Sequence, residues 1–444
     1  MTTPRVRLGG DMAETRQPVS WHIARWGDEQ YSAGSWSYLR PGASPTCRRQ
    51  LAEPIDDRFV LCGEAVGTGQ AAMTHGAYES GIRAGQWAES RTRHGEVNII
   101  IGAGFAGLGA AHYLRSRGAQ CVILEARDRV GGRVHTVNLP GSDGEPTYVD
   151  AGGAWLQQFE RNALADLARS IGCELVPTNF STPRAAAPDG PVGDVAAAFA
   201  TLENAAQAEA RREIDSKSVS NIVHRLTRSI SPEDRRLLQF AVDADVVLET
   251  GAPPGDTSAR WFFEEDGIGS NDHLIVGGYK QLLDVLARDV DIRFNSPVTD
   301  VTWNRAQGVT VTTGGATLEG ARCLCSVPIS LLKRGMPELR PGLPTPHRAA
   351  LAQIGMGIVE KVLLRFETRW WPTSPSGYFR WYDSPSSWCE WIDLSDVCGA
   401  PVVAALIGDD AVRLHHHGRN DQEVALAATK ALHEWAAATT RDNL

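Results

Sequence analysis

The sequence predicts an α/β fold in which a Rossmann-like nucleotide-binding domain is joined to a second domain. The strongest observation is a β-branched run at 97–101 that leads into the glycine block Gly102, Gly104 and Gly107, a helix and a further strand. The length of 444 residues also suits two domains. Such a block usually opens a domain, yet here residues 1–95 precede it and are rich in motifs of their own.

Each part of the glycine block has a physical role. Residues 97–101 predict a buried parallel strand, because an apolar run without alternation suits a strand that is covered on both faces. Gly102 permits a tight turn, Gly104 lets the backbone approach a pyrophosphate, and Gly107 lets the helix pack close to the strand. The helix expected over 108–117 directs its N-terminal N–H groups and the positive end of its dipole at the phosphates.

The second strand, expected over 121–124, ends at Glu125, which lies 18 residues after Gly107. A carboxylate at this place holds the ribose hydroxyls of a dinucleotide, and its charge repels a 2′-phosphate, so NADP is not expected. A glycine-rich turn without a ligand is the alternative. The strand, helix, second strand and glutamate in register favour a nucleotide site.

The composition is that of an ordinary globular protein, with 22% charged and 42% apolar residues. The net charge of −9 argues against a nucleic-acid partner. No apolar run reaches the roughly 20 residues of a membrane span, and residues 1–11 lack the apolar stretch of a signal peptide. We therefore expect a cytoplasmic protein without membrane contacts, for which a homodimer stays open.

No metal site is expected from the cysteines and histidines. The eight cysteines are scattered and lie mostly in apolar stretches, which favours small buried hydrophobes over disulfides. Cys323 and Cys325 share one face of a strand, but nothing nearby completes a zinc site. His415, His416 and His417 favour a solvated loop or strand end, because consecutive side chains on a strand cannot converge on one ion.

A second group of motifs follows the nucleotide block. The pair Gly131 and Gly132 allows another close backbone approach, and Arg133 can reach a diphosphate. The run from Tyr148 to Trp155 is Tyr-Val-Asp-Ala-Gly-Gly-Ala-Trp. With these motifs the sequence resembles the flavin-containing amine oxidase family, which includes monoamine oxidases, polyamine oxidases and lysine-specific histone demethylases. The resemblance implies the amine oxidase fold, with a GR2-type FAD-binding domain and an α+β substrate-binding domain.

Four later segments extend the resemblance over the rest of the chain. Residues 273–283 resemble the family's glycine-glycine helix start, and residues 297–311 resemble the strands whose valine backbone meets the adenine. Residues 325–333 resemble a proline-led helix, and residues 355–371 resemble the strand of the active-site lysine. In the last segment the matching lysine is Lys361.

Residues 1–95 resemble the C-terminal end of the same family. Its tryptophan-led and glycine-aromatic motifs match 26–38, its glycine-glutamate flavin motif matches 58–65, and its last helix matches 73–84. We infer a circular permutation that joins the family's termini through 86–96 and opens new termini in the substrate domain, because permutation is tolerated where termini lie close together at the surface. A fragment of a tandem fusion is the alternative.

The resemblance also assigns domains and cofactor contacts. The FAD-binding domain is expected to comprise 37–160 and 265–330, and the substrate-binding domain 1–36, 161–264 and 331–444. The residues expected to bind FAD come from both ends of the nucleotide block and from residues 1–95, and they are Gly63, Glu64, Met73, Thr74, Gly102, Gly104, Phe105, Ala106, Gly107, Glu125, Ala126, Arg127, Gly132, Arg133, Gly152, Gly153, Ala154, Trp155 and Val298.

The resemblance implies oxidation of a C–N bond. A C–H next to nitrogen gives up a hydride equivalent to FAD, the product is an imine or iminium, and O2 reoxidises the flavin to give H2O2. Lys361 matches the lysine that reaches flavin N5 through a water, although a surface lysine is the alternative. Glu64 is expected to have a raised pKa beside an anionic cofactor and to move a proton, and a purely FAD-anchoring role is expected equally.

The sequence departs from the family at the substrate and at the flavin. The aromatic pair that grips the substrate nitrogen is incomplete, because Trp36 matches one position but Met73 occupies the other. Ser35 replaces the cysteine that bonds to FAD in monoamine oxidases, so FAD is expected to bind non-covalently. The residues expected to contact the substrate are Trp36, Met73, Trp155 and Trp381.

A large substrate is the first expectation. The aromatic segment from Trp370 to Trp391 is expected to divide between core packing and the wall of a wide cavity. Residues 182–208 predict a loop leading into a helix, either a cover for the cavity or a passive surface excursion. These features suggest an amide oxidase of antibiotic biosynthesis that acts on a polyketide and then closes a ring by a Mannich step, with Glu64 as candidate base.

Two other functions stay open. An ordinary amine or polyamine oxidase would need an acidic site, which the run Glu264-Glu265-Asp266 could supply unless it is a solvated loop. A non-catalytic flavoprotein scaffold that binds a partner is the reading from a different class, and Lys361 argues against it.

Overall fold

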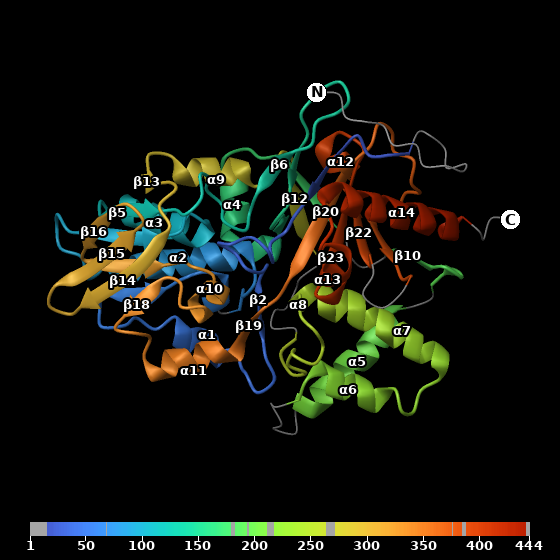
Figure 1. The fold of residues 1–444 in the computed structure, drawn as a ribbon, viewed down its shortest axis with the longest axis horizontal. Coiled ribbons are helices and arrows are strands. Elements are labelled where there is room, and N and C mark those ends of the chain that lie inside the picture. Colours follow the sequence, from blue (N-terminus) through green and yellow to red (C-terminus); the bar gives the residue numbers. More distant parts are fainter. Residues whose placement is uncertain are drawn as a thin grey trace.

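A computed structural model describes residues 16–67, 69–178, 183–192, 195–210, 217–262, 271–374, 376–383 and 388–440. The chain forms two halves built on separate sheets, which lie to the left and the right in Figure 1. Each half has its own layers of strands and helices.

The left half is a nucleotide-binding fold built on a parallel sheet of order β13-β5-β4-β17-β3. Its strands are Ile292–Arg293 (β13), Gln120–Leu124 (β5), Val97–Ile101 (β4), Arg322–Cys325 (β17) and Phe59–Leu61 (β3).

Successive residues of β4 bury opposite faces of this sheet. Ile100 packs with the helices on one face, whereas Ile99 and Ile101 pack against a second sheet on the other face. Because both faces are covered, the strand is apolar apart from Asn98, whose buried side chain donates to the Gln120 carbonyl at 3.2 Å.

Helices and a further sheet form the two covering layers. One face carries Thr74–Glu89 (α2), Phe105–Ser116 (α3), Ala163–Ser170 (α4) and Lys280–Ala287 (α9). The other carries a sheet of order β16-β15-β14-β18, with bounds Thr317–Gly320, Gly308–Thr313, Val298–Asn304 and Glu338–Arg340.

The right half is built on a mixed sheet of order β1-β20-β23-β22-β21-β10-β11. Its strands are Ser20–Ile23 (β1), Val359–Arg365 (β20), Val402–Gly408 (β23), Glu390–Asp393 (β22), Tyr378–Trp381 (β21), Arg184–Ala187 (β10) and Gly190–Pro191 (β11).

Helix α14 (Asp421–Thr439) packs on one face of this mixed sheet. The helical lobe at the lower right of Figure 1 packs on the other face. That lobe contains Val195–Ala210 (α5), Val219–Leu226 (α6), Pro232–Val242 (α7), a π-helical turn Asp243–Val247 and Leu248–Thr250 (α8).

Shorter elements complete the described chain. Two small sheets are formed by Trp155–Leu156 (β8), Asp272–Ile275 (β12) and Leu175–Thr178 (β9), and by Thr136–Asn138 (β6) and Tyr148–Asp150 (β7). The remaining helices include Thr46–Leu51 (α1), Ile329–Lys333 (α10), Thr345–Gln353 (α11), Ser395–Cys398 (α12) and Asp410–His415 (α13).

The residues before the glycine block contribute elements to both halves. Strand β1 pairs with β20, β3 forms the edge of the parallel sheet beside β17, and β2 (Ser37–Leu39) pairs with β19 (Ile354–Met356). Helix α2 crosses α3 so closely that a Cβ at Gly81 would lie 1.9 Å from the Ala106 carbonyl oxygen. This segment is therefore an integral part of the fold.

The expected domain boundary at 330 lies too early in the chain. Strand β18 pairs in parallel with β14, and helix α11 packs against α1 in the core of the nucleotide-binding half. Residues 331–353 therefore pack with the nucleotide-binding half, although the sequence analysis assigns them to the substrate-binding domain. The sequence could not show this, because a parallel strand that follows a helix carries no local signal of the strand with which it pairs.

The structure corrects the expectation of a solvated loop or strand end for two of the three consecutive histidines. His416 is buried and its Nδ1 contacts Oε2 of Glu360, while His415 is half-buried against the Trp388 ring. Burial lowers the pKa of His415 to about 4. The helix α13 turns these side chains inward, which a strand or solvated loop would not do. All eight cysteines are free thiols.

Within the described ranges, no helix is both long and apolar enough to cross a bilayer. In the same part of the chain, no group of metal-ligating side chains is close enough together to hold an ion.

Removal of residues 1–95 should unfold the nucleotide-binding half and abolish flavin binding. The deletion exposes the edge of β17 and the apolar face of α3. Thermal denaturation measures the loss of folding, and the absorbance of the purified protein measures the loss of bound flavin. As the control, residues 16–95 are moved behind residue 440, which is feasible because His433 Nε2 lies 3.3 Å from the Arg16 carbonyl oxygen. The rearranged chain should fold; a truncated chain that still binds flavin would contradict the expectation.

Candidate functional site

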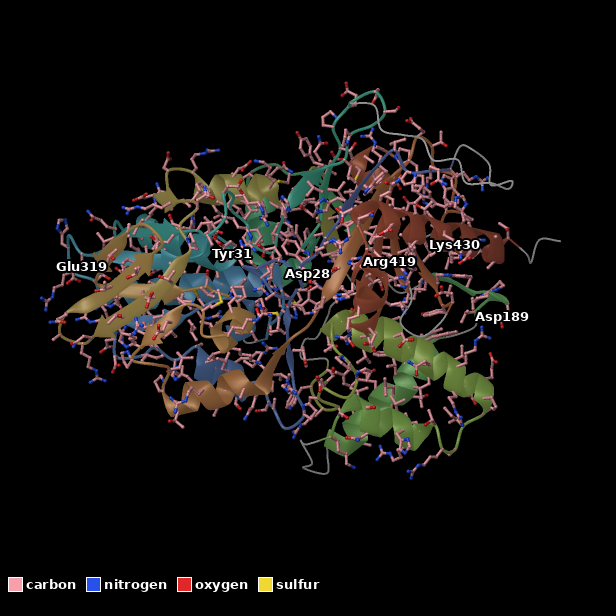
Figure 2. All side chains as sticks on the ribbon, in the orientation of Figure 1. Asp28, Tyr31, Asp189, Glu319, Arg419 and Lys430 are labelled. Carbon is pink, nitrogen blue, oxygen red and sulfur yellow. The ribbon has the colours of Figure 1, made fainter. Side chains whose placement is uncertain are left out.

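A cavity of about 1020 Å³ lies where the two halves meet. Figure 2 shows Asp28 and Tyr31 of the N-terminal segment in this central position. Of the site residues predicted from the sequence, all line the cavity except Gly107 and Trp381. The fold thus brings together residues from the start, the middle and the end of the chain.

The glycine block forms a cradle at the N-terminus of α3. Gly102 has φ of 94°, which favours glycine, and a Cβ at Gly107 would lie 1.9 Å from the Gly102 carbonyl oxygen. A Cβ at Gly104 would meet only the Gly131 carbonyl oxygen, at 3.8 Å, and would otherwise enter the cavity. Gly102 and Gly107 therefore shape the turn, while Gly104 leaves room for a ligand beside the helix N-terminus.

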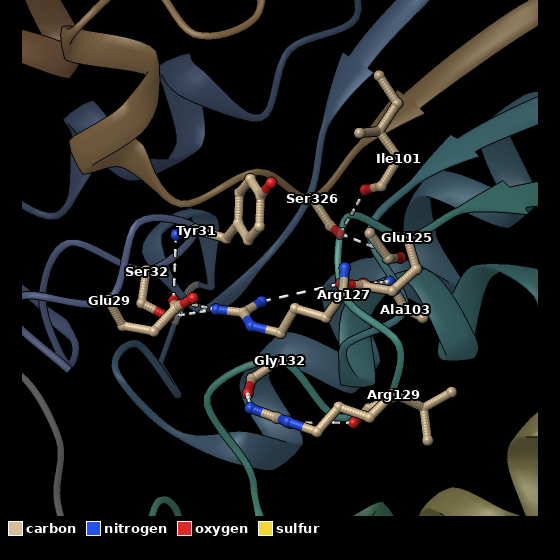
Figure 3. A network of polar contacts seen from close by, with 12 residues as sticks. Glu29, Tyr31, Ser32, Ile101, Ala103, Glu125, Arg127, Arg129, Gly132 and Ser326 are labelled. Atoms are coloured by element: carbon tan, nitrogen blue, oxygen red, sulfur yellow. Dashed lines mark hydrogen bonds and ion pairs between the residues drawn. The ribbon is translucent and has the colours of Figure 1, made fainter. Parts of the chain in front are cut away.

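The end of β5 presents a buried carboxylate, as expected for ribose binding. One oxygen of Glu125 accepts a hydrogen bond from the Ala103 N–H at 2.7 Å and the other from the Arg127 N–H at 2.9 Å. Figure 3 shows Arg127 between Glu125 and the side chains of Glu29 and Ser32. The N-terminal segment therefore closes this end of the cavity.

A buried ion pair joins Glu64 to Arg133. Arg133 donates to Oε1 at 2.8 Å, and the Ser37 hydroxyl donates to Oε2 at 2.7 Å. Burial alone would raise the pKa of Glu64, but Arg133, Ser37 and the nearby Arg48 together hold it below its ordinary value. In these surroundings Glu64 is a carboxylate, and its role beside a bound flavin stays a prediction.

Arg48 is a cavity residue that sequence reasoning missed. Its side chain is 1% exposed, and it donates to the Ser37 hydroxyl at 2.7 Å and to the Ala65 carbonyl at 2.9 Å. The signal was available, because Arg48 lies three residues before Leu51 and one after Cys47, on the buried face of a helix. With Arg127 and Arg133 it places three arginines on the cofactor side of the cavity, and the other two form ion pairs with carboxylates.

These features fit FAD. The cradle at Gly104 and the open space at Gly63, where an added Cβ would meet no atom within 4 Å, leave room for a diphosphate. The helix N-terminus and three arginines supply positive charge for it, and Glu125 supplies acceptors for a ribose.

Lys361 is buried and faces this cavity. In β20 it lies on the same face as Val359 and Leu363, and its Nζ donates to the Gly152 carbonyl at 2.7 Å and to the Asp150 carbonyl at 3.2 Å. Nζ also lies 4.7 Å from the centre of the Trp155 ring. Burial lowers the pKa of Lys361 to about 8, against the opposing effect of Asp150. The alternative of a surface lysine is excluded.

The aromatic segment lies in the core rather than in the cavity wall. Trp381 is 2% exposed and packs in the cluster beneath α14, where Phe379 stacks on Trp435 with ring centres 4.0 Å apart. The described aromatic residues from Trp370 to Trp391 are all absent from the cavity lining. The expected aromatic wall is replaced by residues of other segments, namely Trp36, Trp155, Phe199, Trp261 and Phe262.

The far end of the cavity is acidic, which sequence reasoning also missed. Asp245 of the π-helical turn and Glu249 of α8 are four residues apart, on one face of the helical segment, and both line the cavity, where Glu390 of β22 joins them. Arg380 donates to Asp245 at 2.8 Å and to Glu390 at 3.4 Å. The acidic run expected at 264–266 lies outside the described residues.

The Glu249 side chain is accessible from the cavity that it lines, and the protein surrounds it on its other sides. Burial raises its pKa to about 8, helped by Glu390 and Asp245 and opposed by Arg380. Burial likewise raises the pKa of Glu390. Segment 182–208 contributes here as well, because Phe199 and Glu203 of α5 line the cavity.

Together with the Rossmann-type topology, this cavity defines the chain as a dinucleotide-binding protein. Residues 5–86 and 105–443 match the family model described as flavin containing amine oxidoreductase. The chain therefore belongs to this family of flavin-dependent enzymes that act on C–N bonds, as the sequence resemblance indicated.

Relatives of known type agree with this assignment. A lysine-specific histone demethylase 1 homolog of Arabidopsis thaliana is 29% identical over 338 residues, which are 70% of this chain and 39% of the relative. Polyamine oxidase 2 of the same plant is 30% identical over 315 residues, 64% of this chain and 61% of the relative. The chain thus spans less than two thirds of these relatives.

The fold is that of a putrescine oxidase. The structure of that enzyme bound to putrescine superposes with a TM-score of 0.60 at 20% identity, covering 77% of this chain and 81% of the oxidase.

Gly104→Val should weaken FAD binding by about tenfold or more, because added methyl groups in a filled space cost about 1–3 kcal/mol. The side chain would project into the cavity, so the fold should persist. Binding is measured by flavin titration of the apoprotein. Gly314→Val is the matched control, since its added Cβ also meets no protein atom but faces an exposed loop. Equal affinity in both variants would place the cofactor elsewhere.

Proposed function

We propose that this protein is an FAD-dependent oxidase that converts a C–N bond of a small amine to an imine, with O2 reduced to H2O2. The observation that carries the proposal is the buried Lys361, which faces a cavity that has a cofactor cradle at one end and carboxylates at the other. FAD bound here would accept the two electrons and the hydrogen from the carbon next to nitrogen.

The chain's own groups fit such a reaction. With a pKa of about 8, Lys361 is largely an ammonium at neutral pH, and its fixed carbonyl partners direct that charge at the centre of the cavity. A positioned cation stabilises negative charge that develops on oxygen and orients a water. A buried lysine also costs free energy, which argues against a scaffold without catalysis.

The acidic end favours a cationic substrate. Four carboxylates, Glu203, Asp245, Glu249 and Glu390, face the cavity there, and Arg380 offsets part of their charge. An ammonium group would favour the charged form of Glu249 and lower its pKa on binding. A diamine or polyamine, with one nitrogen for oxidation and another at this end, fits the arrangement. Relatives include polyamine oxidases, and a putrescine oxidase shares the fold.

The polyketide reading has lost its main support. It rested on the permuted chain, the incomplete aromatic pair and a wide aromatic wall, and the aromatic segment packs in the core instead of forming that wall. The likeness to the amide oxidase and macrocyclase of lankacidin biosynthesis is therefore retained as the competing outcome of a substrate test.

We also propose that FAD binds without a covalent bond. The Ser35 hydroxyl, at the place of the cysteine in monoamine oxidases, donates to the Val359 carbonyl at 2.6 Å and accepts from its N–H at 2.9 Å. Both hydrogen bonds tie the loop before β2 to β20, so the hydroxyl is already engaged. Acid precipitation should release all of the flavin into solution.

A circular permutation accounts for the chain order. The N-terminal segment supplies β3 and α2 to the nucleotide-binding half and β1 to the other half, and only a short link, residues 90–96, separates α2 from β4. Arg16 and His433 place the two described ends together. The variant with residues 16–95 moved behind residue 440 tests the permutation, because it restores the order of the family. If the rearranged chain folds only when two copies of it associate, a fragment of a tandem fusion is favoured instead.

Glu249→Gln should raise KM for a diamine by about tenfold and leave KM for a monoamine of similar length unchanged, because a charge-assisted hydrogen bond contributes about 1.5–3 kcal/mol. The test is anaerobic flavin bleaching with amines, polyamines and amide-bearing polyketides. In the wild type, KM for the diamine should fall as pH rises towards 8, since the carboxylate form binds the cation. This dependence should be absent in the variant.

Asp243→Asn is the matched control for Glu249→Gln. It removes a carboxylate from the π-helical turn that directly precedes α8, but Asp243 accepts from Gln239 and does not line the cavity. Bleaching by the polyketides and not by the amines would overturn the proposed substrate class.

Lys361→Met should slow flavin reoxidation by O2 by about 100-fold, the usual scale for removing a positioned electrostatic group. The wild-type rate constant, measured by stopped flow, should fall as pH rises through about 8, because the ammonium is lost. The variant should show no such step. Full turnover in Lys361→Met would show that the Lys361 ammonium does not assist flavin reoxidation.

Lys333→Met is the control, since Lys333 also donates to a backbone carbonyl, that of Ile354, but is exposed and lies outside the cavity wall. Stability gives a second readout for Lys361. Its folded-state pKa lies below the ordinary value, so the folded state binds fewer protons and the free energy of unfolding should rise between about pH 8 and 10. Lys361→Met should lack this rise.

A further inference from the structure

A second, small chamber lies directly behind Lys361. Its volume is about 20 Å³, and it shares Ala154, Trp155 and Lys361 with the wall of the large cavity. The three residues form the partition between the two spaces. At the other side the chamber reaches Tyr148, whose side chain is 51% exposed. None of the four carboxylates of the acidic end lines it.

The chamber is mostly apolar. Beyond the partition, its wall is made largely of aliphatic side chains from β7, β12, β22, β23 and α12 with its N-cap, namely Val149, Leu274, Ile275, Ile392, Leu394, Val397 and Ala404. A space of this size holds about one small molecule. Apolar cavities stay free of water and take up apolar gases such as xenon.

The polar groups at the chamber are engaged with protein partners. Lys361 Nζ donates to the carbonyls of Asp150 and Gly152, which leaves one of its three N–H groups. The Asp150 carboxylate accepts from the Thr136 hydroxyl and from the Tyr279 N–H. Because the rest of the wall is mostly aliphatic, the chamber offers a water few polar partners and offers a small apolar molecule contacts over most of its surface.

We propose that this chamber binds O2 and delivers it to the cofactor cavity past Lys361. The inference rests on the proposed oxidase function and adds a separate place for its second substrate. Because the chamber avoids the acidic end, O2 can wait beside the cofactor while the amine or its product still occupies that end.

The position of Lys361 suits the chemistry that follows. O2 takes two electrons from the reduced cofactor and two protons, and it leaves as H2O2. Negative charge develops on oxygen during this transfer, and the ammonium at the partition lies where oxygen leaves the chamber. Lys361 thus has a role on both sides of the partition.

The first test is xenon binding to the flavin-loaded protein, by crystallography under xenon pressure. One xenon atom is expected among Lys361, Ile392 and Ala404 in the wild type, and none in Ala404→Val, which fills the chamber. Ala405→Val is the matched control, because Ala405 adds the same bulk to the same strand on its opposite face. An ordered water in the chamber, or no xenon there, would overturn the proposal.

The second test is the rate at which O2 reoxidises enzyme reduced with dithionite, which needs no amine. Ala404→Val should slow this step by about fivefold, equivalent to a barrier about 1 kcal/mol higher. Ala405→Val should not slow it, and both variants should keep the wild-type rate of reduction by the amine. Unchanged reoxidation in a variant that has lost xenon would also overturn the proposal.

Failure of the proposed function and failure of the O2 chamber give different results. If no amine reduces the flavin, the proposed function is wrong, while the xenon and dithionite experiments still show whether the chamber binds O2. If Ala404→Val does not fold, Val397→Leu fills the same space from a less buried position and replaces it.

Discussion

The ion pair between Glu64 and Arg133 is the interaction on which the site depends. It joins the segment that precedes the nucleotide block to the block itself, and Ser37 and Arg48 complete its hydrogen bonds. Breaking one partner of a buried pair costs about 3–5 kcal/mol, because the other charge is left uncompensated. The pair therefore holds both sides of the cofactor cavity in place.

Charge is arranged along the cavity in the order in which the reaction needs it. Arginines and a helix N-terminus lie at the cradle, a single buried lysine lies at the centre, and carboxylates lie at the far end. The mixed sheet makes this order possible, because β20 is covered on both faces and can hold Lys361 in a fixed orientation. The fold supplies rigidity, and the side chains supply an electrostatic gradient from anion binding to cation binding.

The cofactor side could be predicted from the sequence, and the substrate side could not. The roles of Gly102, Gly104 and Gly107 follow from local geometry, since a turn, a close approach and a helix contact each require glycine. The acidic end is assembled from α5, the π-helical turn and β22, which are far apart in the chain. Trp381 was misplaced for the same reason, because an aromatic residue on a strand packs against whichever layer tertiary structure provides.

The π-helical turn has a consequence for how substrate preference can change. It contains Asp245 and directly precedes α8, which carries Glu249, so it lies within the segment that supplies two of the carboxylates of the acidic end. Loss of one residue would restore α-helical spacing and change which side chains of the turn face the cavity, while no residue of the turn belongs to the mixed sheet or to the cofactor cradle. Insertions and deletions at this turn thus offer relatives of this chain a route to new substrates that leaves the cofactor site unaltered.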